Sequence, residues 1–176
     1  MSAVNLDQIA KEYQAEEKKI KRRIVVCAGT GCMANGAMKV ISALRAAADA
    51  AGVSVTLELK PETGAKDVHL SKSGCQGFCQ MGPLVNIEPD DILYCRVKAE
   101  DAEEIVKATL QEGKVIDRLL YQDPTDGKHC RGHQDIPFYT RQQRTVLKPC
   151  GSMDPEDVRE YIARGGHQAA MKAVTQ

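Results

Sequence analysis

The chain has 176 residues, which is enough for one domain with a substantial core and an appendage. Its 24 basic and 24 acidic side chains cancel and it has no tryptophan, so neither nucleic acid nor an anionic membrane is an expected partner. No apolar run is long enough to span a membrane, and residues 1–23 are too polar for a signal peptide, so we expect a cytoplasmic protein. Seven cysteines in such a protein favour metal or thiol chemistry over a disulfide framework.

Residues 1–22 are predicted to form a peripheral helix. Four apolar side chains recur there at near-helical spacing among many charges: Leu6, Ile9, Tyr13 and Ile20. The basic run Lys18–Arg23 closes this segment, and we expect it to stay solvated while it complements the helix dipole.

A strand, a helix and a second strand are predicted next. Ile24–Val26 has the composition of a short buried strand, and it runs straight into Cys27. A helix opens after Asn35-Gly36 and stops at Gly52, and residues 53–59 then alternate apolar and polar side chains as a half-exposed strand does. The three elements form a βαβ unit, which places Cys27 at the carboxyl end of a strand, where open α/β folds commonly have their sites.

A β-hairpin and a helix follow this unit. The predicted elements are a loop at 61–66, strands at 84–87 and 92–97, and a helix at 102–110 that Gly113 ends. The order β-α-β followed by β-β-α is thioredoxin-like. The sequence therefore predicts an α/β domain over residues 23–113, with a mixed sheet covered by helices and a short helical C-terminal segment after it.

Four cysteines lie in two close pairs that the βαβ unit separates. The first pair is Cys27 and Cys32, spaced C-x4-C, and the second is Cys75 and Cys79, spaced C-x3-C. Four thiolates from two loops can hold a structural zinc ion or a small iron–sulfur cluster. Flanking glycines would let the backbone approach inorganic sulfides and aim N–H groups at them: Gly29, Gly31, Gly74 and Gly77.

Spacing alone leaves several kinds of site open. Zinc knuckles are usually C-x2-C or C-x4-C and the plant-type ferredoxin run is C-x4-C-x2-C, and the pattern here matches neither in full. The glycines favour the cluster over zinc. A redox-active disulfide ranks third, because the sequence has no C-x-x-C pair.

The remainder of the chain changes character twice. Residues 114–135 are rich in turn formers without sustained periodicity and are predicted to be a linker. Residues 136–176 regain order, with Asp154 predicted to cap a helix that Gly165-Gly166 stops and another helix starting near His167. This tail is too short to bury its own core, so we expect it to dock on something else or to begin a further domain.

The other cysteines and histidines have simpler interpretations. Cys95, which falls mid-strand in this prediction, and Cys150 are expected to be structural. His129, Cys130 and His133 could form half of a zinc site, although linker histidines are usually only solvated. Three further features are expected at surface or edge positions: His69, His167 and the charge run Arg141–Arg144.

Two sets of motifs resemble a known family of enzyme subunits. The segments VCAGTGC at 26–32 and GCQGFCQMGPLV at 74–85 resemble the thioredoxin-like 2Fe-2S ferredoxin domain at the N-terminus of the flavoprotein subunit of NAD(P)-dependent iron hydrogenases and related formate dehydrogenases. Residues 135–139, 146–151 and 154–166 are similar to the opening segment of the flavoprotein subunit of complex I, which those enzymes share. The resemblance covers nearly everything after residue 22.

The resemblance implies a 2Fe-2S cluster with Cys27, Cys32, Cys75 and Cys79 as its ligands. In that family the opening segment leads to a glycine-rich loop for FMN and NADH and then to cysteines for a 4Fe-4S cluster, and neither occurs in this sequence. Residues 136–176 would be the truncated start of the flavoprotein region, in a fragment or in the product of a split gene. The implied function is a relay of single electrons between a flavin site and partner iron–sulfur subunits, without catalysis by this chain alone. FMN and NAD(P) would belong to the missing part or to a partner subunit.

Two other functions stay open on the sequence. A free-standing thioredoxin-like ferredoxin would carry electrons between several partners, but the tail would then have no purpose. A zinc-stapled adaptor without redox activity is the other alternative, and metal analysis and colour would distinguish it from a ferredoxin.

Overall fold

The computed structural model describes residues 4–60 and 66–175. Its centre is a five-stranded sheet in the order β2-β3-β1-β4-β5. The strands are β1 Ile20–Cys27, β2 Val55–Thr56, β3 Lys66–Ser73, β4 Val85–Glu88 and β5 Ile92–Tyr94. β1 pairs parallel with β3 and antiparallel with β4, which confirms the predicted α/β class with a mixed sheet. The loop predicted at 61–66 lies outside the described residues except for Lys66, which begins β3.

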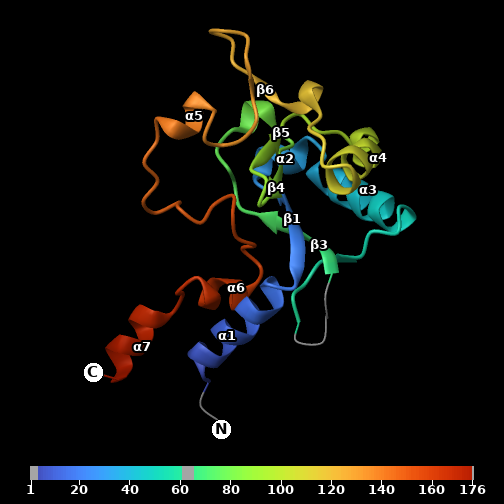
Figure 1. Cartoon of the computed structure of the whole chain (residues 1–176). Coiled ribbons are helices and arrows are strands. Elements are labelled where there is room, and N and C mark those ends of the chain that lie inside the picture. Colours follow the sequence, from blue (N-terminus) through green and yellow to red (C-terminus); the bar gives the residue numbers. More distant parts are fainter. Residues whose placement is uncertain (1–3, 61–65, 176) are drawn as a thin grey trace.

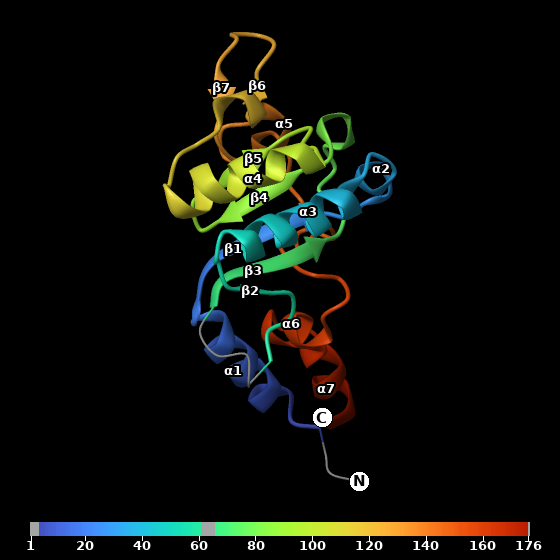
Figure 2. The same cartoon turned by 90° about the vertical axis from the view of Figure 1, so that its right-hand side faces the viewer.

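Helices cover one face of the sheet, and the C-terminal tail crosses the other (Figure 1, Figure 2). The covering helices are α3 Ala37–Ala50 and a continuous helical segment made of η2 Ala99–Asp101, α4 Ala102–Glu104 and the π-helical η3 Ile105–Gln111. Both predicted helices are thereby confirmed, and Gly113 adopts the left-handed φ of +68° that ends the second one. The last five residues of β1 are buried, as expected for a central strand covered on both sides.

Two strands differ from the sequence prediction. Residues 53–59 were predicted to form one strand, but only Val55 and Thr56 pair with β3. The Thr56 hydroxyl donates to the Glu58 carbonyl at 2.6 Å, and the chain turns there so that Leu59 is buried. The strand β3 was not predicted at all, although it lies between β1 and β2. Its side chains are mostly polar, so the hydrophobic pattern gives little sign of it.

The predicted hairpin is confirmed, although its second strand is shorter than expected. β4 pairs with β5 antiparallel, and β5 ends at Tyr94 rather than at residue 97. Cys95 therefore lies just after the strand and not in its middle, where its backbone N–H donates to the Leu119 carbonyl. Cys95 is still buried, as predicted.

Residues 114–135 do not form a linker. They contain η4 Asp117–Leu119 and a small hairpin of β6 Tyr121–Gln122 and β7 His129–Cys130, whose turn holds the predicted turn formers. Ile116, Leu119 and Cys130 are buried against the main core. Elements of two or three residues are too short to produce a periodic pattern, which is why the composition suggested an unstructured spacer.

The two ends of the described chain pack together (Figure 1). The helix predicted within residues 1–22 is α1 Leu6–Glu17, because β1 already begins at Ile20. The tail forms α5 Pro137–Thr140, α6 Val158–Ala163 and α7 Gln168–Thr175, and α6 lies against α1. The tail thus docks on the rest of the chain. None of the helices in residues 4–60 and 66–175 is both long and apolar enough to cross a membrane.

The cap of α6 is Asp157 and not Asp154. The Asp157 carboxylate accepts hydrogen bonds from the backbone N–H groups of Arg159 and Glu160, at 2.9 and 3.4 Å. Asp154 instead accepts from the backbone N–H of Glu156 in the preceding turn, at 2.9 Å. The sequence offers two aspartates three residues apart, and only the tertiary position of the tail decides between them.

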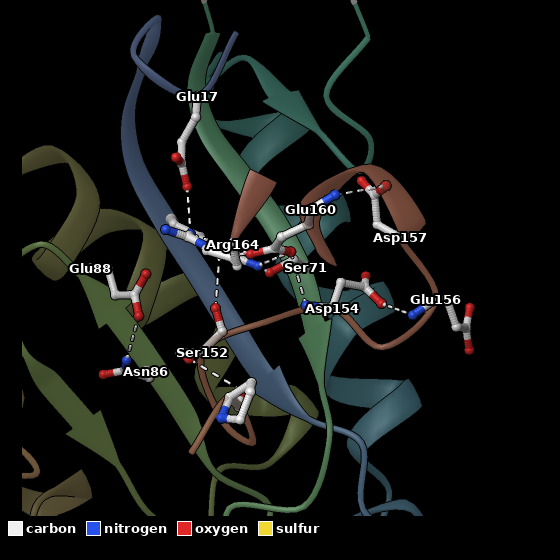
Figure 3. A network of polar contacts seen from close by, with 12 residues as sticks. Glu17, Ser71, Asn86, Glu88, Ser152, Asp154, Glu156, Asp157, Glu160 and Arg164 are labelled. Carbon is white, nitrogen blue, oxygen red and sulfur yellow. Dashed lines mark hydrogen bonds and ion pairs between the residues drawn. The ribbon is translucent and has the colours of Figure 1, made fainter. Parts of the chain in front are cut away.

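A buried ion pair joins the tail to the sheet. Arg23 on β1 is 7% exposed and Glu160 on α6 is fully buried, so the expectation that the whole basic run 18–23 stays solvated is wrong for Arg23. Figure 3 shows Glu160 reaching from α6 toward the strands, with Ser71 and Asp154 beside it. His69 on β3 lies on the same face and is 5% exposed, so it is not the surface residue that its isolation in the sequence suggested. His167 is exposed as predicted.

Candidate metal centre

The topology brings the two cysteine loops together. Cys27 is the last residue of β1, and the loop that holds Cys75 and Cys79 follows the parallel neighbour β3. Cys27 pairs in register with Ser73, so both loops leave the sheet at the same edge. Cys32 lies in the short helix α2 Thr30–Ala34, which follows β1 directly.

The four sulfur atoms interact with one another. The Sγ atoms of Cys75 and Cys79 are 3.8 Å apart, and Cys27 lies close enough to Cys32 and Cys75 for both thiols to lower its pKa. Cys27 and Cys32 are each 1% exposed, whereas Cys75 and Cys79 reach the surface. The structure therefore gathers all four predicted cysteines into one cluster, with an inner pair and an outer pair.

The proton affinities within the cluster are unequal. The Cys32 thiol and backbone N–H groups of Gln76 and Gly29 hydrogen-bond to Cys27 and lower its pKa to about 6, despite its burial. The same contact raises the pKa of Cys32, and the hydrogen bond with Cys75 raises the pKa of Cys79. Neighbouring thiols that share protons in this way are groups from which a metal displaces protons when it binds.

Glycines leave room at the cysteines. A Cβ atom at Gly29 would lie 2.8 Å from the Cβ of Cys75, and one at Gly82 would lie 2.5 Å from the Sγ of Cys32. Gly31 faces Cys79, with its Cβ position 3.6 Å from that sulfur. The sequence predicted this role for Gly29 and Gly31, and the structure adds Gly82 to them.

Backbone N–H groups point at the sulfur atoms. The N–H of Gly77, a residue with a φ of +88°, donates to the Sγ of Cys75 at 3.4 Å, and the backbone of Gln76 contributes to the lowered pKa of Cys27. Gly74 has a different neighbour, since its Cβ position lies 3.7 Å from the Sγ of Cys150. Hydrogen bonds of this kind are one of the means by which proteins set the potential of an iron–sulfur cluster.

The donor set fits an iron–sulfur cluster. Four thiols from two loops, N–H groups directed at sulfur, and glycines where side chains would collide are the features that such a cluster requires. In residues 4–60 and 66–175, no three His, Cys, Asp or Glu side chains are arranged as a ready site for a metal ion. His129, Cys130 and His133 accordingly do not form such a group, and the His133 ring is bonded to Asp91 at 3.2 Å.

The tail covers the second cysteine loop, which sequence reasoning missed. Phe138 stacks on Phe78 with ring centroids 4.7 Å apart, and Arg144 donates to the backbone carbonyl of Gln76 at 2.5 Å. Arg144 is therefore not the purely solvated residue that the charge run 141–144 suggested. Gln76 is fully buried beneath this cover.

The remaining cysteines lie outside the cluster. Burial raises the pKa of Cys95 to about 12 and also raises the pKa of Cys130. Both are buried, which agrees with a structural role for Cys95, and Cys150 is half-buried in the tail beside Gly74.

The chain is similar to known 2Fe-2S ferredoxins. A 2Fe-2S ferredoxin of Clostridium pasteurianum is 31% identical over 99 residues, which are 56% of this chain and 94% of the relative. A 2Fe-2S ferredoxin of Aquifex aeolicus (strain VF5) is 41% identical over 51 residues, which are 29% of this chain and 46% of that protein. A crystal structure of the thioredoxin-like 2Fe-2S ferredoxin from Aquifex aeolicus matches with a TM-score of 0.45 and 25% identity, over 58% of this chain and 97% of that one.

The family match extends over all five strands of the main sheet and both cysteine loops. Residues 1–110 match the family described as thioredoxin-like 2Fe-2S ferredoxin, and this range contains all four clustered cysteines. Ferredoxins of this kind transfer electrons through a 2Fe-2S cluster. The chain belongs to the thioredoxin-like 2Fe-2S ferredoxin family, and its cofactor is a 2Fe-2S cluster.

Proposed function

We propose that Cys27, Cys32, Cys75 and Cys79 are the cluster ligands. The observation that carries this assignment is the convergence of their sulfur atoms from two loops, with glycines in place of the side chains that would block them. When bound, a 2Fe-2S cluster supplies a centre that takes up and gives back one electron. Four cysteine ligands leave no open coordination position, so this site binds no substrate and relays electrons instead.

The inner and outer cysteines have different tasks in this proposal. Cys27 and Cys32 are buried and anchor the site in the core of the fold. Cys75 and Cys79 are exposed, so their side of the site is where a redox partner approaches most closely. The backbone N–H groups of Gln76 and Gly77 stabilise negative charge on the sulfur atoms.

Serine substitution tests the four ligands one at a time. The full chain is reconstituted anaerobically with iron and sulfide, and iron content, visible absorption and the EPR signal of the reduced protein are measured. We expect each of C27S, C32S, C75S and C79S to lose or alter all three, while C95S, which changes a buried cysteine outside the site, keeps them. A wild-type protein that binds only zinc and stays colourless would contradict the proposal.

The wider context that we propose is a multi-subunit NAD(P)-dependent oxidoreductase of the hydrogenase or formate dehydrogenase type. Support comes from the resemblance of residues 135–166 to the opening of a flavoprotein subunit and from the packing of that tail against the ferredoxin domain. The relay would pass single electrons between a flavin site and partner iron–sulfur subunits. FMN and NAD(P) would bind in those other parts, since hydride chemistry needs a cofactor that carries two electrons.

Purification of the tagged chain from its own cell under anoxic conditions tests this context. We expect flavin-containing and iron–sulfur subunits to co-purify, and NADH or NADPH to reduce the 2Fe-2S centre in the complex but not in the isolated chain. The alternative is a free-standing carrier, which the match to 94% of the Clostridium pasteurianum ferredoxin favours. It predicts a chain that purifies alone and whose cluster NAD(P)H does not reduce in any fraction.

A further inference from the structure

Arg144 touches the metal centre through a single peptide group. Its Nη2 atom donates to the carbonyl oxygen of Gln76 at 2.5 Å. The N–H of the same peptide belongs to Gly77 and donates to the Sγ of Cys75 at 3.4 Å. In a trans peptide these two groups point in opposite directions, so guanidinium, peptide and sulfur form one chain of hydrogen bonds.

The Arg144 side chain is held in this position by other groups of the tail. Its Nη1 atom donates to the carbonyl of Cys150 at 3.4 Å, and its guanidinium lies over the Tyr139 ring at 5.2 Å from the centroid. A Cβ atom at Gly77 would lie 3.3 Å from Nη2, a tight contact, and the φ of +88° at this position itself favours glycine. Arg144 is partly buried and lies beyond residues 1–110, which are the part of the chain that matches the ferredoxin family.

We infer that Arg144 is a positioning residue for the metal centre, which polarises the Gln76–Gly77 peptide and so strengthens the hydrogen bond to the Cys75 sulfur. A hydrogen bond from a charged donor is stronger than one between neutral groups, and neighbouring hydrogen bonds in a chain polarise one another. The inference rests on the proposed function, because it takes Cys75 as a cluster ligand. It adds that the tail tunes the redox centre as well as covering it.

The physical consequence is a higher reduction potential. Reduction adds one negative charge to the centre, and stronger N–H donation to sulfur stabilises that charge. A guanidinium within one peptide group of the sulfur acts in the same direction. Removing Arg144 should therefore make the centre harder to reduce, even where the cluster itself remains intact.

The test compares R144M with R141M in the full, cluster-loaded chain. Arg141 lies in the same charge run, and in the described part of the chain its side chain makes no hydrogen bond or ion pair, so R141M removes an equal charge without touching the loop. EPR-monitored redox titration with dithionite as the reductant gives the potential of each variant. We expect R144M to lower the equilibrium constant for one-electron reduction about tenfold, which corresponds to about 59 mV. R141M should leave this equilibrium constant unchanged. R144K should lower it less than R144M does, because lysine retains a charged donor.

Each outcome separates tuning from a purely structural role. If R144M loosens the tail in hydrogen exchange but keeps the wild-type potential at equal iron content, the inference is wrong. Equal shifts in R144M and R141M would also overturn it, because they would reflect net charge alone. Should R144M fail to assemble the cluster, R144Q carries the test with the same expected direction. A wild-type chain without a 2Fe-2S signal would instead defeat the proposed function, so the two failures are distinguishable.

Discussion

Arg23 and Glu160, which are 137 positions apart in the sequence, form a two-point ion pair inside the protein. Arg23 Nη1 lies 2.7 Å from Glu160 Oε1, and Nη2 lies 2.9 Å from Oε2. Arg23 also donates to the Ser71 hydroxyl at 2.9 Å and to the Ser152 carbonyl at 3.0 Å. This network connects β1, which leads into Cys27, to the tail that covers the second cysteine loop.

Loss of one partner of this pair should destabilise the protein strongly. E160A leaves the Arg23 guanidinium buried without its counter-charge, which typically costs about 3–5 kcal/mol. E156A removes an exposed partner of Lys72 and should lower the free energy of unfolding by no more than about 1 kcal/mol. Urea unfolding of the cluster-loaded chain measures the free energy of unfolding of both variants.

The double variant R23M/E160L provides an internal check on this prediction. It replaces the pair with apolar side chains and should recover much of the stability lost in E160A, because no buried charge is left unpaired. An E160A protein that is as stable as E156A would contradict the account.

His69 should make the stability fall in mildly acidic solution. Burial, reinforced by the charge of Arg23, lowers the pKa of His69 from 6.5 to about 4 in the folded protein. As the pH falls, the unfolded chain takes up a proton on His69 before the folded protein does. The stability that the neutral, buried His69 contributes is therefore complete above pH 6.5 and is lost as the pH falls toward 4. Between pH 7.5 and 5.5 we expect a loss of about 1 to 1.5 kcal/mol.

Comparison with H69N isolates this contribution. Asparagine does not titrate, so the stability difference between H69N and the wild type should change across this pH range by the amount that His69 contributes. The thermal midpoints of the two cluster-loaded proteins, followed at several pH values, give that difference. Parallel curves for the two proteins would show that His69 does not titrate differently on unfolding.

The sequence predicts those parts of the fold whose causes are local. Three elements are marked by their own hydrophobic pattern and, for the last two, by a glycine or proline: the strand at Ile24–Val26, the helix that ends near Gly52 and the hairpin around residues 89–91. The two close cysteine pairs are also visible in the sequence, but β3, the parallel neighbour of β1 that places the second pair beside the first, was not predicted.

Features that depend on distant partners could not be predicted in the same way. The strand β3 has two apolar side chains, Val68 and Leu70, and its buried polar residue Ser71 accepts a hydrogen bond from Arg23, which in turn pairs with Glu160 of the tail. Arg23 and Arg144 both belong to charged runs that normally stay in water, and each hydrogen-bonds with acceptors from other parts of the chain, Glu160 and Gln76 among them. No pattern within either run identifies those acceptors.

A methyl group at Gly29 should disturb the metal centre. Its Cβ would lie 2.8 Å from the Cβ and 3.0 Å from the Cα of Cys75, so the second cysteine loop must move to admit it. G74A is a matched control, because a Cβ there would be 3.7 Å from the Cys150 sulfur, an ordinary contact. We expect G29A to bind substantially less iron than wild type after reconstitution, and G74A to bind a normal amount. Equal iron and sulfide content in the two variants would show that the close approach at Gly29 is not required.

The two aspartates before α6 should respond unequally to substitution. D157A removes the acceptor for the N–H groups of Arg159 and Glu160 and should cost about 1 kcal/mol, as loss of a helix cap usually does. D154A should lower stability less, because the Asp154 carboxylate accepts a hydrogen bond only in the turn before the helix, and the backbone N–H of residue 154 still donates to Glu160 at 2.9 Å.

Urea unfolding measures the loss of global stability in both variants, and hydrogen exchange in residues 158–163 reports on the helix itself. Because α6 carries Glu160 into the buried pair with Arg23, faster exchange in D157A should extend to β1. A larger effect from D154A would instead support the cap position that the sequence suggested.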